Sequence, residues 1–103
     1  MPKVKIQKEL NMKAEKLFKT IENILTTDKE IKALEPHLTF KSESSDGEVK
    51  GQIKGSRVNG DIHIKQLNEE KSSILIELSL PLILTPFKTI VEKKIKDKLE
   101  AIG

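Results

Sequence analysis

The spacing of the apolar residues changes three times along this chain, and these changes limit the folds it can adopt. From position 37 to 80 they recur at every second residue, as in Ile74, Ile76 and Leu78. They also alternate within residues 3–10, whereas directly before and after the 37–80 segment they recur at three- and four-residue spacings. A period of two is typical of strands with one buried face, and a period near 3.6 is typical of amphipathic helices. The pattern therefore predicts a sheet with one dry face that helices cover.

The expected order is strand, helix, short helix, four strands and long helix. The first strand covers residues 3–10, and Asn11 is expected to cap the helix that follows. Asp28 is expected to cap the short helix, which the dipeptide Glu35-Pro36 ends. Turns are predicted at 44–47, within 55–60 and at 68–71. In the second of these, either Gly55-Ser56 or Asn59-Gly60 could form the reversal, and Asn59-Gly60 is the stronger hairpin pair.

The final helix is expected to open at Thr85-Pro86, because threonine caps helices well and proline suits the first helical position. Its apolar stripe consists of Phe87, Ile90, Val91, Ile95, Leu99 and Ile102. We therefore expect a single α+β domain spanning residues 1–103. A curved antiparallel sheet of about five strands would grip the long C-terminal helix in a reduced helix-grip arrangement.

Composition narrows the class of protein further. The chain has 103 residues, a size typical of one domain, and no cysteine, which excludes disulfides and thiolate metal sites. The first residues carry no apolar run of signal-peptide type, and the longest apolar stretch, near 80–84, is too short to span a bilayer. We expect a soluble, cytoplasmic protein.

The charges do not indicate a nucleic-acid partner. The net charge is +3, and the basic residues are lysines except for Arg57. Acidic and basic side chains are interspersed along the chain, and there is no Trp or Tyr to stack on bases. The pattern is typical of a solvated surface coated with lysine.

No catalytic or metal-binding constellation is recognisable. His63 shares a strand face with Asp61 and Lys65. However, the sequence has no candidate nucleophile or third metal ligand at a spacing typical of a catalytic or metal-binding site. His37 follows a proline and is expected at the surface of a loop. The glycines are scattered rather than clustered before a helix, so they do not predict a phosphate-binding loop. We expect no enzyme activity and no cofactor.

Two sets of apolar residues are candidates for binding. The segment before the last helix cannot bury all of its side chains, so part of it is a candidate contact surface formed by Leu82, Ile83, Leu84 and Lys88. The alternative is a buried corner between strand and helix. A second set lines either the core or a pocket between sheet and helix: Phe18, Phe40, Ile62, Ile64, Ile76, Leu78, Phe87, Ile90 and Val91.

Residues 80–88 (LPLILTPFK), together with Ile90, Val91, Ile95 and Leu99, resemble the C-terminal signature of the polyhydroxyalkanoic acid system family. Residues 58–62 resemble that family's strand entry of valine, glycine and an aliphatic residue, whereas Arg57 stands where the family often has glycine. The resemblance covers the last half of the chain. The ending is also similar to START-like helix-grip binders of hydrophobic ligands.

The resemblance implies a small bacterial protein associated with polyhydroxyalkanoate storage granules, and it transfers no catalytic residue. Three hypotheses stay open. The protein binds the surface of such a granule or another apolar surface, it carries a lipid or hydroxyacyl ligand between sheet and helix, or it docks a protein partner as a monomer or homodimer.

Overall fold

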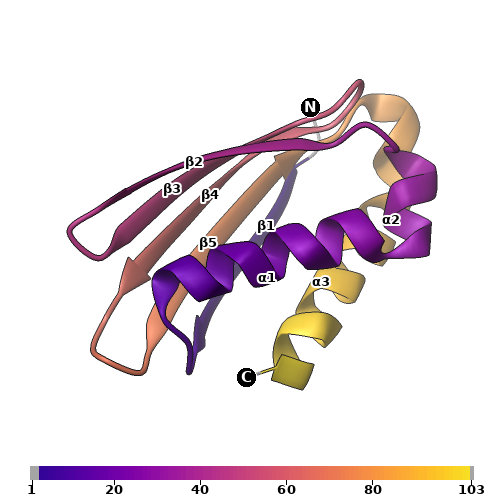
Figure 1. Ribbon diagram of the computed structural model, residues 1–103. Helices are drawn as coiled ribbons and strands as arrows, with labels where there is room; N and C mark the ends of the chain where they lie inside the picture. Colours follow the sequence, from indigo (N-terminus) through magenta and orange to yellow (C-terminus); the bar gives the residue numbers. More distant parts are fainter. Residues whose placement is uncertain (1–2, 103) are drawn as a thin grey trace.

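The computed structural model describes residues 3–102, with only the backbone at Ile102. Five strands form one antiparallel sheet in the order β1-β5-β4-β3-β2 (Figure 1). The strands are β1 (Lys3–Leu10), β2 (Thr39–Ser45), β3 (Glu48–Lys54), β4 (Asn59–Gln66) and β5 (Ser72–Ser79). The helices are α1 (Ala14–Thr27), α2 (Lys29–Leu34), the 3₁₀ helix η1 (Leu82–Phe87) and α3 (Lys88–Ile102).

The sheet has one buried face and one exposed face, as the alternation predicts. Along β5, Ile74, Ile76 and Leu78 are at most 3% exposed, whereas the residues between them are partly exposed. In β1, Val4 and Ile6 lie on the same buried face, opposite Leu78 and Ile76. The predicted antiparallel order of strands and helices is confirmed.

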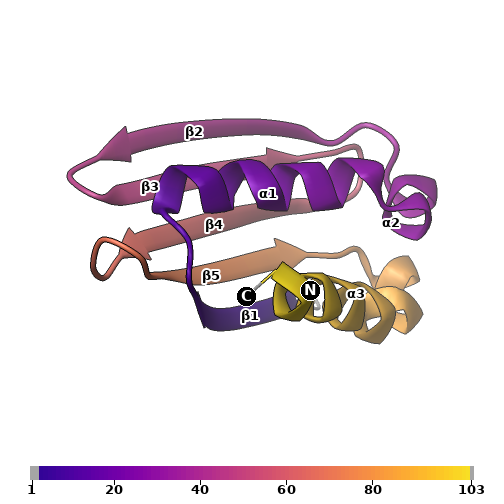
Figure 2. The ribbon, with the colours of Figure 1, turned by 60° about the horizontal axis from the view of Figure 1, so that its bottom comes forward.

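Both long helices cover that buried face, side by side (Figure 2). Helix α1 lies over β3 and β4 and inserts Leu17, Phe18 and Ile21. Helix α3 lies over β1 and buries Ile95 and Leu99 completely. The sheet therefore grips two helices rather than the C-terminal helix alone. Ile102, which was predicted to extend the α3 stripe, has a side chain outside the described residues.

The first helix does not begin at an Asn11 cap. Lys13 occupies the N-cap position of α1 and makes no capping hydrogen bond with its side chain. The linker is instead tied to the sheet, because Ser72 Oγ donates to the Met12 carbonyl oxygen at 2.6 Å. Gln66 Oε1 accepts from the Ala14 amide at 3.4 Å. The Gln66 side chain from β4 thus accepts from one of the free amides at this helix start, and Ser72 from β5 fixes the linker that precedes it.

The turn between β3 and β4 lies before Asn59-Gly60. It spans residues 55–58, and the Gly55 amide donates to the Val58 carbonyl oxygen at 2.8 Å. Gly60 belongs to β4, where a β-carbon would overlap the Glu77 carbonyl oxygen of β5. The glycine is needed for close approach of two strands rather than for a turn. The predicted 44–47 turn is a two-residue hairpin loop at Asp46-Gly47, both with positive φ.

The last helical segment begins earlier than Thr85-Pro86. Pro81 is the N-cap of η1, and the Leu84 amide donates to the Pro81 carbonyl oxygen at 2.9 Å. Pro86 lies inside η1 and has no amide hydrogen to donate to Leu82, so an α-helix through this turn would lose a hydrogen bond. The tighter 3₁₀ turn therefore precedes α3.

Candidate functional site

The turn before α3 exposes two large apolar side chains. Leu82 is 76% exposed and Ile83 is 75% exposed. Phe87 and Ile90 follow at helical spacing and are also exposed, at 37% and 42%. We call these four residues the η1 corner. Their clustering is notable because an apolar side chain exposed beside others of its kind is typical of contact surfaces, whereas a single one is not.

The predicted contact surface is divided by the turn. Leu84 is 5% exposed and belongs to the core, so it cannot contribute to a surface contact. A 3₁₀ turn points neighbouring side chains in different directions, which is why Leu84 turns inward while Leu82 and Ile83 turn out. Lys88, the first residue of α3, is half-buried beside this turn.

An apolar crevice lies behind the η1 corner, where the ends of the strands meet α2, η1 and α3. Its free volume is about 30 Å³, roughly the share of one water molecule in the liquid. A drug-sized ligand needs roughly 300 Å³ or more. The crevice is therefore closed to such a ligand as it stands. It is lined by Leu25, Ile31, Leu34, Glu35, Leu38, Ile53, Val58, Leu78, Leu80, Leu84, Phe87 and Val91.

The predicted pocket residues separate into three groups. Leu78, Phe87 and Val91 line the crevice. Phe40 is half-buried at the edge of the core, and Ile90 is exposed on α3. The remaining four are buried in the core: Phe18, Ile62, Ile64 and Ile76.

A buried carboxylate beside the crevice was missed by the sequence reasoning. Glu35 is 3% exposed, and its Oε1 accepts hydrogen bonds from the amides of Arg57 at 2.6 Å and Val58 at 3.1 Å. Burial raises the pKa of Glu35, but the hydrogen bonds from backbone amides, that of Arg57 first, outweigh burial and hold the pKa below its usual value. The Arg57 guanidinium donates from Nη2 to the Leu34 carbonyl oxygen at 2.7 Å.

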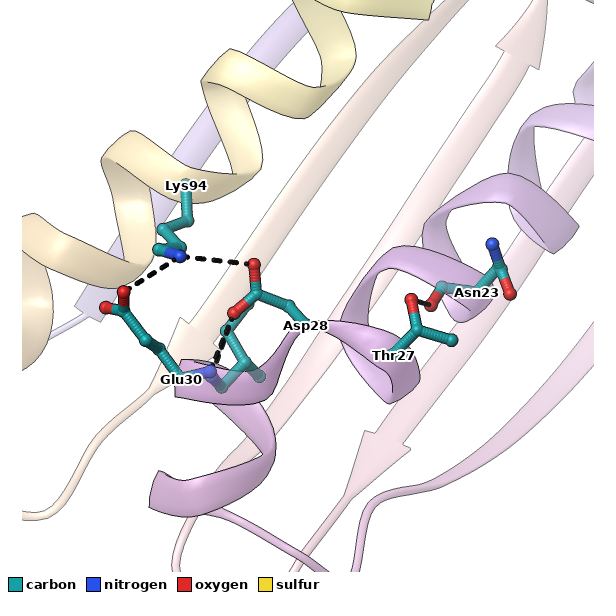
Figure 3. A network of polar contacts seen from close by, with 6 residues as sticks. Asn23, Thr27, Asp28, Glu30 and Lys94 are labelled. Carbon is teal, nitrogen blue, oxygen red and sulfur yellow. Dashed lines mark hydrogen bonds and ion pairs between the residues drawn. The ribbon is translucent and has the colours of Figure 1, made fainter.

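A second polar network joins α2 to α3 (Figure 3). Lys94 Nζ lies 3.0 Å from Glu30 Oε1 and 3.4 Å from Asp28 Oδ2. The other oxygen of Asp28 caps α2 by accepting from the amides of Glu30 at 2.9 Å and Ile31 at 3.2 Å. Burial raises the pKa of Asp28, but these amides and Lys94 outweigh it, so the pKa lies below its ordinary value. The hydrogen bond to Glu30 raises the pKa of Lys94.

The two histidines lie where the sequence placed them, on the surface. His63 is on the exposed face of the sheet, and its Nε2 lies 3.5 Å from Glu48 Oε2 on the neighbouring strand, rather than pairing with Asp61. His37 is exposed between α2 and β2. Within residues 3–102 the structure places no three His, Asp or Glu side chains together as ligands for a metal ion.

In the part of the chain that the structure describes, no helix combines the length and apolar character needed to cross a bilayer.

The likeness of this chain to known proteins is found among solved structures. No family model matches the chain, and no curated protein matches it. Among solved structures, the chain is similar to a START superfamily protein from Mycobacterium smegmatis, with 12% identity and a TM-score of 0.41. That likeness covers 95% of this chain and 89% of the other. The helix-grip arrangement described above rests on this chain's own strand order and helix packing, and the resemblance to the polyhydroxyalkanoic acid system family stays a prediction.

Proposed function

We propose that this protein is a non-enzymatic binding protein that docks its η1 corner on a lipid-coated apolar surface, such as that of a polyhydroxyalkanoate granule. One observation carries the proposal: Leu82 and Ile83 stand next to each other and are three-quarters exposed. Fully burying a leucine or isoleucine side chain contributes roughly 1.5–3 kcal/mol. Two such side chains, with help from Phe87 and Ile90, supply enough free energy for reversible attachment to a surface.

The local structure makes Leu82 and Ile83 suitable for insertion. Leu84 anchors the turn in the core, and the Leu84 amide bonds to Pro81, so the exposed pair projects from a fixed backbone. A preorganised turn loses less conformational entropy on binding than a mobile loop would.

Cationic residues near the corner favour an anionic lipid coat. Lys88 follows Phe87 directly, and among the described residues no carboxylate forms an ion pair with Lys88 or Arg57. A basic side chain near an anionic lipid surface contributes about 1 kcal/mol. Together these features support a contact that has an apolar centre and a basic rim.

The test is co-sedimentation of the purified protein with vesicles of phosphatidylcholine and phosphatidylglycerol, and with polyester granules that carry a lipid coat. The double variant Leu82→Ser/Ile83→Ser should stay folded and lose sedimentation. Leu67→Ser is the matched control, because Leu67 is 47% exposed in the β4–β5 loop, at the other end of β5. Equal recovery of a folded double variant and the wild type would exclude the η1 corner as the contact. Binding to granules but not to vesicles would favour the granule.

A second candidate function is the carriage of a hydrophobic ligand, and the crevice favours it. Eleven of its twelve lining residues are apolar, and one of them, Phe87, is also 37% exposed to solvent. The crevice would have to widen before a lipid or hydroxyacyl chain could enter. Native mass spectrometry of the protein from cells tests this candidate. A co-purifying lipid would support it, and a ligand-free mass together with no titration by added dodecanoate would exclude it.

A further inference from the structure

Helix α2 forms one wall of the crevice but is only weakly anchored by apolar contacts. Ile31 and Leu34 point into the crevice. Of the six residues of α2, only Ile31 is buried, whereas α1 buries six of its fourteen. Because apolar burial is what normally holds a short helix in place, moving α2 away costs far less than moving α1.

Polar contacts hold both ends of α2 instead. At its start, Asp28 and Glu30 share the ammonium group of Lys94 on α3. Just after its end, Glu35 is bound by the amides of Arg57 and Val58 in the β3–β4 loop. Asp28 and Glu35 are the two most buried carboxylates in these networks. Asp28 directly precedes α2, and Glu35 directly follows it. This arrangement ties α2 to two other elements without packing it tightly against either.

We infer that α2 is a latched lid over a site for one unbranched acyl chain. This inference rests on the second candidate function and names its ligand class. Release of the lid would withdraw Ile31 and Leu34 and join their space to the existing crevice. The remaining walls are aliphatic apart from Phe87 and Glu35, and the Glu35 carboxylate already accepts hydrogen bonds from the amides of Arg57 and Val58. The aliphatic walls match the chemistry of a methylene chain.

Charge at the rim supports a chain that ends in a carboxylate. Arg57 lies in the 55–58 turn next to Val58, which lines the crevice, and its guanidinium donates to the carbonyl oxygen of Leu34. Lys88 follows Phe87, another lining residue. Within the described residues, neither cation is paired with a carboxylate. A fatty-acid carboxylate at this rim would gain charge-assisted hydrogen bonds.

The test compares Lys94→Met with the wild type in calorimetric titrations with sodium dodecanoate. Methionine keeps the apolar stem but removes the latch at the start of α2, while the Glu35 contacts after its end remain. Because the apparent dissociation constant scales inversely with the fraction of open molecules, we expect Lys94→Met to bind about fivefold more tightly. Lys96→Met is the matched control. Lys96 pairs with Glu92 on α3 itself at 3.0 Å, so its loss leaves the lid latched and should leave the affinity unchanged.

Two further measurements make the result decisive. Amide exchange in α2, but not in α1, should be faster in Lys94→Met, which reports the lid without any ligand. Leu38→Trp, which fills the crevice from outside the lid, should abolish dodecanoate binding in the Lys94→Met background. The inference is overturned if a folded Lys94→Met binds dodecanoate no more tightly than the wild type, or if Leu38→Trp leaves binding intact. Binding to vesicles through Leu82 and Ile83 is measured in a separate sedimentation experiment. That binding can therefore persist even when the lid inference is overturned.

Discussion

The ring of Phe18 occupies the space that a side chain at position 51 would need. A β-carbon built on Gly51, in the middle of β3, would overlap the edge of that ring. Phe18 is 7% exposed, and its position brings α1 against the sheet next to Val49 and Ile53. The glycine in this strand is therefore required by packing, since its φ is not positive and no turn needs it.

Gly51→Ala should lower the free energy of unfolding by about 1–2 kcal/mol. Overpacking a core costs roughly 1–3 kcal/mol. Alanine has less backbone entropy than glycine in the unfolded chain, and this offsets only part of that cost. Urea denaturation measures the change. Phe18→Leu makes room for the added methyl group, so the double variant should lose less stability than the two single losses added together. An alanine variant as stable as the wild type would show that Phe18 can move away freely.

Glu35→Ala should destabilise the fold by about 2–3 kcal/mol, because the amides of Arg57 and Val58 would lose their buried acceptor. Glu35→Gln keeps one acceptor oxygen and should cost less. The control is Glu43→Ala, an exposed glutamate in β2, for which we expect a change within about 0.5 kcal/mol. Similar denaturation midpoints for Glu35→Ala and Glu43→Ala would contradict the role of Glu35 as the buried acceptor that anchors the β3–β4 loop.

The sequence predicted the sheet well because the alternation of side chains is a local property. Ile74, Ile76 and Leu78 lie on one face whatever the partner strands are, and the buried row was assigned correctly. The exposed half of the turn at Leu82 and Ile83 could also be expected, since three consecutive apolar residues cannot all face a core. Leu84 was included in the candidate contact surface, with a buried corner as the alternative. The sequence could not decide between them, because the direction of each side chain in a 3₁₀ turn does not follow the strand or α-helix period.

The polar anchors could not be predicted from local pattern. Glu35 precedes a proline and looks like a surface residue at the end of a helix, yet its partners lie 22 and 23 positions further along the chain. Lys94 meets Asp28 across 66 positions. The same holds for the start of α1, where Gln66 from β4 replaces the expected Asn11 cap. Only the three-dimensional arrangement brings these groups together.

Stability should fall in acid through the two buried carboxylates. The pKa values of Asp28 and Glu35 in the folded protein lie below the ordinary values of 3.8 and 4.5. Their contribution is therefore fully present above those ordinary values and is lost as the pH falls through the lower, folded pKa values. Urea midpoints measured from neutral pH down to about pH 3 should drop in the wild type.

Variants that cannot titrate distinguish the contribution of Asp28 from that of Glu35. Asp28→Asn keeps a capping oxygen, and Glu35→Gln keeps an acceptor, but neither can titrate. Each variant should be less stable than the wild type at neutral pH and should lose less stability on acidification. A wild type and a double variant with parallel pH profiles would mean that other carboxylates cause the acid sensitivity.

Neighbouring residues of η1 should respond in opposite ways to truncation. Leu84 is 5% exposed, so Leu84→Ala should cost about 2–4 kcal/mol, because it leaves a cavity in the core next to the crevice. Ile83 is 75% exposed, so Ile83→Ala should change the free energy of unfolding by no more than about 0.5 kcal/mol. Thermal or urea denaturation of the two variants, measured side by side, checks this contrast. If Ile83→Ala proved as costly as Leu84→Ala, Ile83 would be buried in solution, and the η1 corner could not offer it to an apolar surface.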